Sequence, residues 1–180
     1  MTYPDFLSPS AYEPFPVDGL IVSVPKSIVS FKKWQGEKIR NDFGGKPLID
    51  YFGRPLFAEL AIMRTFLDDG WQTRWVETYG TKEPKCMVAW KDDEYKDQEH
   101  SPFEDEAIGF LFSEIASKNG GSYSGCWDVV AKKDNNIIFA ESKRSKKDAI
   151  RESQQKWFRA ALQCGLSQDN FLMVQWDFAS

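Results

Sequence analysis

The chain has 180 residues, of which 42% are hydrophobic, and its formal net charge is −4 at pH 7. This length and apolar content suit one α/β domain with a buried core, and the acidic balance excludes a protein coated in basic residues for non-specific nucleic-acid binding. The sequence has no apolar run long enough to span a membrane, no secretory signal and no Cys-x-x-Cys pair, so we expect a cytoplasmic protein with free thiols in a reducing environment and no membrane partner.

Residues 1–54 are interpreted as an extended N-terminal arm. Prolines are frequent at its start, a short apolar run at 20–24 predicts one strand, and paired glycines near its end predict a turn. Basic and aromatic residues alternate in the second half of the arm, at Lys32, Lys33, Trp34, Lys38 and Arg40. Such interleaving is typical of a nucleic-acid contact surface, although an ordinary solvated face is the more frequent explanation.

The segment after the arm predicts a helix and then a strand. A helix is expected over residues 56–67, because its leucines and Met63 recur at helical spacing. Glu59 falls on the flank of this apolar stripe, where a carboxylate needs a partner. Residues 72–79 alternate and are rich in β-forming residues, which predicts a strand. Residues 81–121 then carry an acidic run and a predicted helix, and are interpreted as an insertion.

The C-terminal third has the most regular pattern. Two apolar runs, 126–131 and 136–140, flank a polar turn and predict a β-hairpin. A long helix is predicted over residues 146–164, with Gln154 on its inward face, and a last strand is predicted at 171–176.

The predicted elements together define a fold class. From residue 55 onward their order is α-β-β-β-α-β. This order predicts an α/β fold with a central mixed four-stranded sheet flanked by helices. The core is expected in residues 55–80 and 122–178, with the arm and the insertion as additions to a single domain.

Three residues of the hairpin form a constellation suited to phosphodiester hydrolysis. Asp128 lies in the first strand and Glu141 at the end of the second, and antiparallel neighbours bring two such carboxylates within reach of one Mg²⁺ ion. Lys143 points to the same side of an extended chain as Glu141 and can orient a water or neutralise the transition state. Glu-x-Lys also occurs elsewhere in the chain, but only this copy follows an apolar strand with an acid in the preceding strand. A surface salt-bridge arrangement is the alternative.

Charge is unevenly distributed along the chain. Acidic residues gather between 92 and 106, and basic residues between 132 and 156. A basic stretch beside a carboxylate site suits an enzyme that acts on a polyanion, whereas a solvated charged face is the plainer alternative. His100 is the only histidine and lies within the acidic run, so no histidine-based hydrolytic site is predicted.

The same residues carry a family resemblance. The residues that carry it are Asp128, Glu141-Ser142-Lys143 and Gln154-Gln155-Lys156-Trp157. Arranged as strand, strand and helix, they resemble the PD-(D/E)xK nuclease superfamily, whose core is restriction-endonuclease-like. They are most similar to its virus-type replication-repair nuclease (VRR-NUC) branch. In that branch a Gln-x-x-Trp helix follows the Glu-x-Lys strand, and an earlier helix supplies a glutamate that matches Glu59.

The resemblance implies a set of site residues. A Mg²⁺ or Mn²⁺ ion would be held by Asp128, Glu141, the main-chain carbonyl of Ser142 and, directly or through water, Glu59. Lys143 would serve the attacking water, and Gln154 would support the site or contact phosphate.

This chain departs from the family pattern at two places. Trp127 stands where a proline often precedes the aspartate, and a long insertion separates the first predicted strand from Asp128. Because of the insertion, Glu77 competes with Glu59 for the role of the extra acid.

These observations predict a divalent-metal-dependent nuclease, with endonucleolytic cleavage of DNA as the expected reaction. Two alternatives stay open: an RNA-directed enzyme with the same site, and a catalytically silent nucleic-acid-binding or scaffold module of the same fold. A homodimer is also left open, since enzymes that cut both strands through one site per chain often pair. The sequence specifies neither base preference nor the favoured nucleic-acid structure.

Overall fold

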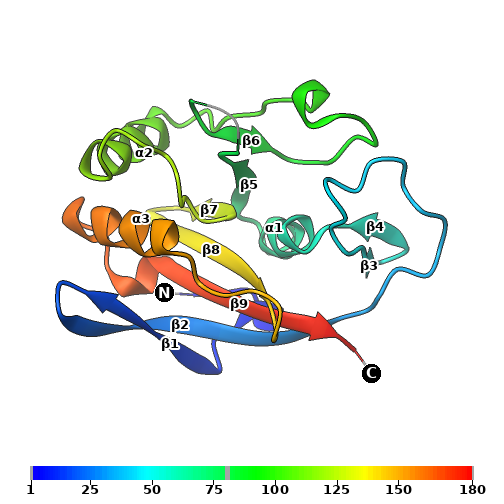
Figure 1. The fold of residues 1–180 in the computed structure, drawn as a ribbon, viewed down its shortest axis with the longest axis horizontal. Helices are drawn as coiled ribbons and strands as arrows, with labels where there is room; N and C mark the ends of the chain where they lie inside the picture. The colour runs from blue at the N-terminus through cyan, green and yellow to red at the C-terminus, as the bar shows by residue number, and fades with distance from the viewer. Residues whose placement is uncertain (1, 80–81, 180) are drawn as a thin grey trace.

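The computed structural model describes residues 2–79 and 82–179, and its central feature is a mixed seven-stranded sheet with helices on both faces (Figure 1). The strand order is β1-β2-β9-β8-β7-β5-β6. The strands are β1 (Ala11–Val17), β2 (Leu20–Phe31), β5 (Gln72–Glu77), β6 (Lys85–Met87), β7 (Val129–Lys133), β8 (Asn136–Arg144) and β9 (Phe171–Phe178). β9 runs parallel to both of its neighbours, β2 and β8, and the other pairs are antiparallel.

Three α-helices and a small second sheet complete the described chain. The helices are α1 (Ala58–Asp68), α2 (Glu106–Lys118) and α3 (Glu152–Gln163). The second sheet pairs β3 (Ile49–Tyr51) with β4 (Arg54–Leu56), and short 3-10 helices occur at η1 (Asp5–Leu7), η2 (Tyr95–Asp97) and η3 (Gln168–Asn170). Among the described residues, no helix combines the length and the apolar character that crossing a membrane requires.

The prediction of a four-stranded sheet is wrong, because three further strands join the four that the sequence predicted. The predicted strands are β5, β7, β8 and β9, and they lie next to one another. β6, from the insertion, pairs with β5, and β2, from the presumed arm, pairs with β9 over Lys26–Phe31. The α-β-β-β-α-β order is retained in α1, β5, β7, β8, α3 and β9.

Residues 11–31 are strands in the main sheet rather than part of an extended arm. β1 is an edge strand, so its Pro14 and Pro16 need not donate main-chain hydrogen bonds to a further neighbour. β2 extends past the apolar run that marked it, and its polar Ser27 is fully buried because the hydroxyl donates a hydrogen bond to the Leu7 carbonyl.

Different helices pack on the two faces of the sheet, and the alternating side chains of β8 show which helix lies on which face. Ile138 and Ala140 pack with α1, whereas Phe139 between them packs with α2 and α3. Glu141 and Lys143 follow at the spacing of Phe139 and therefore lie on the α3 face. Figure 1 shows α2 and α3 on the left and α1 to the right of the central strands.

The helix boundaries correct two predictions. α1 begins at Ala58 rather than residue 56, because Leu56 belongs to β4, and Leu67 of its expected stripe is 40% exposed. α3 begins at Glu152 rather than residue 146, because Lys146 has a left-handed φ of 58° and the chain turns there.

The insertion holds the predicted helix, α2, and adds β6. Its predicted boundary with the core, at residues 80 and 81, lies outside the described residues.

Candidate functional site

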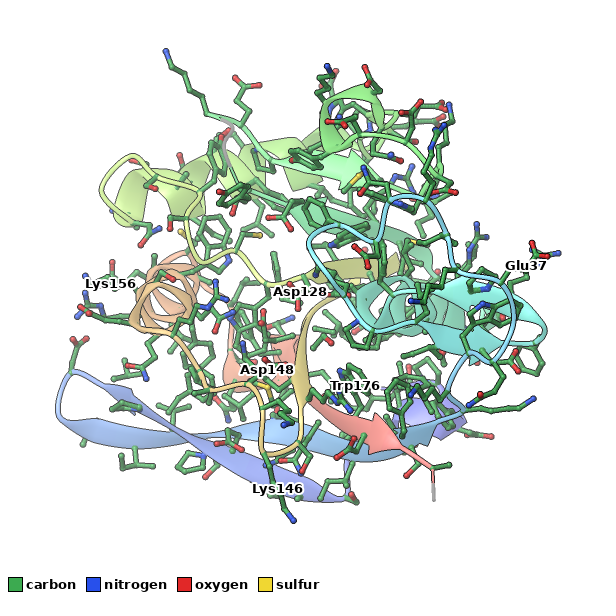
Figure 2. The ribbon with its side chains drawn as sticks, turned by 45° about the vertical axis from the view of Figure 1, so that its right-hand side comes forward. Glu37, Asp128, Lys146, Asp148, Lys156 and Trp176 are labelled. Carbon is green, nitrogen blue, oxygen red and sulfur yellow. The ribbon has the colours of Figure 1, made fainter. Side chains whose placement is uncertain are left out.

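A cleft of about 1250 Å³ opens where β7 and β8 separate. The β7–β8 pairing stops at Val129 and Ala140, while β8 continues beside β9 to Arg144. The last residues of β8 thus lack a partner strand on one side, and the cleft occupies that place. Figure 2 shows Asp128 near the centre of the molecule, with Asp148 and Trp176 below it, and all three line the cleft.

Asp128 and Glu141 are brought together by the strand register. Asp128 lies one residue before β7 rather than in it, and continuing the pairing of Val129 with Ala140 sets Asp128 opposite Glu141. Its main chain still belongs to the sheet, because its carbonyl accepts a hydrogen bond from Val76 N at 2.7 Å. Its carboxylate Oδ2 accepts one from Ser142 N at 2.9 Å, which fixes the side chain against β8.

Glu141 is held by one carboxylate oxygen only. Its Oε1 accepts from Lys143 Nζ at 2.9 Å and from Gln154 Nε2 at 2.5 Å. Its Oε2 is buried and makes no hydrogen bond of good geometry in the described part of the chain, although the main-chain amide of Asp128 faces the carboxylate. Because Glu141 is only 2% exposed, this unpaired oxygen is costly unless something binds it.

Gln154 is oriented from the helix to which it belongs. Its side-chain oxygen accepts from Arg151 N at 2.9 Å, a bond that satisfies a free amide at the start of α3. The amide nitrogen must then face the other way, toward Glu141. The inward face predicted for Gln154 is confirmed, since it is only 8% exposed.

Gly125 allows the first turn of α3 to pack closely against the segment that leads into β7. Its φ is +84°, and a Cβ at this position would collide with the main chain of Ser153 and Gln154.

We therefore expect Gly125→Ala to push α3 outward and to lower the free energy of unfolding by about 2–4 kcal/mol. Gly121→Ala is the matched control, because its φ is +78° but nothing lies within 4 Å of its Cβ. It should cost only about 1 kcal/mol. Urea denaturation of both variants measures the difference, and equal losses would show that Gly125 does not set the approach of α3.

Glu59 reaches the same cleft from α1, paired with a lysine that sequence reasoning missed. Its Oε1 forms an ion pair with Lys46 Nζ, and Lys46 also lies 5.5 Å from the ring centroids of Phe43 and Trp75. Burial alone would lower the pKa of Lys46, but the carboxylates of Glu59 and Asp128 outweigh it and raise that pKa. The only signal in the sequence for such a lysine was that the carboxylate of Glu59, on the flank of an apolar stripe, needs a partner.

Glu77, the competing acid, lies at the end of β5 and also lines the cleft. Its Oε1 accepts the main-chain amides of Thr78 and Tyr79, each at 2.9 Å. This carboxylate therefore caps the end of the strand, whereas that of Glu59 is matched by an ammonium group.

The electrostatics of the cleft disfavour two ionised carboxylates without a cation. Desolvation, followed by repulsion from Glu141 and Glu59, raises the pKa of Asp128 well above its usual value. Desolvation also raises the pKa of Glu141, although Lys143 and the main-chain amide of Asp128 oppose the shift. Within residues 2–79 and 82–179, no group of three or more His, Cys, Asp or Glu side chains forms a ready-made metal cluster. The residues present suit an ion held by two carboxylates and completed by main-chain oxygen and water.

Other residues singled out in the sequence have structural partners. His100 Nδ1 accepts from Cys86 N at 3.2 Å and so anchors β6, and Trp157 is fully buried in the core. In the arm, Lys32 pairs with Asp50 and Arg40 with Asp92 and Asp93, outside the cleft.

The structure thus adds Lys46 to one cleft at which it gathers all six predicted site residues: Asp128, Glu141, Ser142, Lys143, Gln154 and Glu59. Trp176 Nε1 supports the group by donating to Ser142 Oγ at 2.9 Å. Comparisons with protein-family models, with curated proteins and with solved structures found no match for this chain.

Proposed function

We propose that this protein is a divalent-metal-dependent nuclease whose active site is the cleft around Asp128 and Glu141. The observation that carries the proposal is the asymmetric binding of Glu141, whose Oε1 accepts two side-chain hydrogen bonds while its buried Oε2 accepts no side-chain hydrogen bond from residues 2–79 or 82–179. A carboxylate fixed in this way presents a single oxygen, and a cation is the partner that such an oxygen suits.

Asp128, Glu141 and the main-chain carbonyl of Ser142 would hold the ion, with Glu59 contributing directly or through water. When bound, Mg²⁺ or Mn²⁺ would neutralise charge on phosphate oxygens and make a water nucleophilic near neutral pH. The desolvated, mutually repelling carboxylates support this assignment, because a cation relieves their repulsion.

Lys143 would act on the attacking water or on the phosphate. Its ammonium, held at 2.9 Å by Glu141 Oε1 and only 9% exposed, can orient the attacking water or offset charge on the phosphate. Gln154 would keep the Glu141 carboxylate in place. Arg144, Lys147 and Arg151 also line the cleft, and they suit contacts with the phosphates of a polyanion.

The proposed fold family is the restriction-endonuclease-like PD-(D/E)xK group, most similar to its VRR-NUC branch. The adjacent strands β5, β7, β8 and β9 with α1 and α3 support it, as does the Glu-x-Lys segment within β8. We propose DNA as the substrate and internal cleavage as the reaction, with a homodimer for cuts in both strands. RNA cleavage and binding without cleavage are outcomes that the experiments distinguish.

The role of Lys143 separates metal binding from catalysis. We expect Lys143→Met to slow cleavage of labelled DNA in Mg²⁺ by about 10²–10³-fold, because the metal ligands stay while the group that serves the water is removed. Stabilisation by Mn²⁺, measured as a rise in melting temperature, should be retained.

Lys156→Met is the control, because Lys156 pairs with Glu152 on the exposed face of α3. It should cleave at the wild-type rate. Wild-type cleavage by Lys143→Met would remove Lys143 from the active site, and failure of Mn²⁺ to stabilise even the wild type would contradict the metal site itself.

A further inference from the structure

The ion pair between Glu59 and Lys46 lies in the same cleft as Asp128 and Glu141. Resting on the function proposed above, we infer that Lys46 takes the place of a second cation, so that the centre binds one divalent ion rather than two.

Pairing within the cleft supports this inference. Lys46 matches Glu59 and Lys143 matches Glu141, whereas Asp128 accepts a main-chain amide. Among the described residues, the carboxylate of Asp128 and the Oε2 of Glu141 therefore have no ammonium partner, which leaves room for one cation beside them.

The position of Lys46 also disfavours a second ion, because its ammonium already occupies the place beside Glu59. A second ion beside Glu59 would meet the ammonium of Lys46 and be repelled by it.

Lys46 is placed by its loop rather than free on the surface. Asp42 caps the turn, with its carbonyl accepting Lys46 N at 3.0 Å and its Oδ1 accepting Gly45 N at 2.8 Å. The neighbouring Phe43 ring packs against both Trp75 and Trp90, with ring centroids 5.8 and 5.1 Å away. The aliphatic stem of Lys46 thus approaches Glu59 from a fixed direction.

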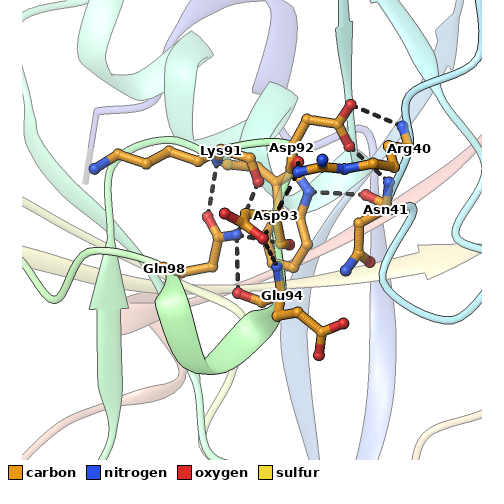
Figure 3. A network of polar contacts seen from close by, with 8 residues as sticks. Arg40, Asn41, Lys91, Asp92, Asp93, Glu94 and Gln98 are labelled. Carbon is orange, nitrogen blue, oxygen red and sulfur yellow. Dashed lines mark hydrogen bonds and ion pairs between the residues drawn. The ribbon is translucent and has the colours of Figure 1, made fainter.

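The acidic insertion holds this loop from outside. Asp92 accepts the main-chain amides of Arg40 at 2.8 Å and Asn41 at 2.6 Å, and Figure 3 shows these contacts. Trp90 Nε1 donates to the Asn41 carbonyl at 2.9 Å. Gln98 closes the acidic loop by bonding both the amide and the carbonyl of Lys91 at 2.8 Å. The insertion therefore positions Lys46, and its carboxylates here bind the arm.

Counting bound Mn²⁺ tests the inference with a readout independent of cleavage. Electron paramagnetic resonance of free Mn²⁺ during titration should give one ion per wild-type chain and two per Lys46→Met chain. Lys46→Arg keeps the positive charge and should bind one. Lys46→Met combined with Glu59→Gln removes both charges of the pair and should also bind one. Circular dichroism confirms folding of each variant.

The outcomes separate the two claims. No Mn²⁺ bound by the wild type would contradict the proposed metal centre. Two ions per wild-type chain, or one ion per Lys46→Met chain over the same concentration range, would overturn the role of Lys46 while leaving the metal centre in place.

Discussion

Glu141→Gln should abolish metal-dependent cleavage, with a loss of about 10³-fold or more. An amide has one acceptor oxygen and one NH₂ group. If the glutamine oxygen faces Lys143 and Gln154, its NH₂ group points at the cation. If the amide is flipped, the NH₂ group faces the two donors, Lys143 Nζ and Gln154 Nε2. Either arrangement removes an anionic ligand, so stabilisation by Mn²⁺ should also be lost.

The same substitution should destabilise the metal-free protein. Lys143 is 9% exposed and would keep its positive charge without the carboxylate that neutralises it. We expect the free energy of unfolding to fall by about 2–3 kcal/mol in urea denaturation. Glu152→Gln is the matched control, because it breaks an exposed glutamate–lysine pair on α3. That change should stay within about 0.5 kcal/mol, and an equally small effect of Glu141→Gln would mean that Lys143 does not depend on it.

Asp128→Asn should also abolish cleavage and Mn²⁺ binding, but with the opposite effect on stability. The asparagine oxygen can still accept the hydrogen bond from Ser142 N. The charge that repels Glu141 and Glu59 in a desolvated place is removed. We expect the metal-free protein to gain about 1 kcal/mol in free energy of unfolding.

The pH dependence of the stability difference between Asp128→Asn and the wild type tests the sign of this gain a second time. Because the folded-state pKa of Asp128 is raised, the wild type loses stability relative to Asp128→Asn as pH rises above the unfolded-state value of about 4. The advantage of Asp128→Asn should therefore shrink in acid and grow toward neutral pH. Asp134→Asn, at the exposed β7–β8 turn, should change neither stability nor cleavage. A loss of stability in Asp128→Asn at neutral pH would mean that the native site favours the ionised aspartate.

The central strands and the carboxylate pair could be predicted because they depend on local patterns. The apolar run before Glu141 marked β8, and the position of Asp128 opposite Glu141 followed from hairpin pairing. Lys143 followed from the alternation of side chains along that strand. These properties need only a few neighbouring residues, so the sequence contains them directly.

The remaining features depend on contacts between distant segments. β1 was not predicted because its sequence contains prolines, which a strand tolerates only at the edge of a sheet, and the sequence does not show which strand lies at the edge. Lys46 was missed because it reaches Glu59 from an irregular loop, which the insertion holds through Asp92. The sequence predicted the last helix from residue 146, and only the left-handed turn at Lys146 shows that α3 starts later, at Glu152.

Cleavage by the wild-type protein is the most direct test of a metal-dependent nuclease. Labelled double-stranded, single-stranded and branched DNA, together with RNA, should be incubated in Mg²⁺, in Mn²⁺ and in EDTA, with Glu141→Gln run alongside. We predict cutting of DNA in either metal, none in EDTA, and none by Glu141→Gln. Preferential cutting of RNA would reassign the substrate. Absence of cutting on every substrate by well-folded wild type, or equal cutting by Glu141→Gln, would contradict a nuclease site at Asp128 and Glu141.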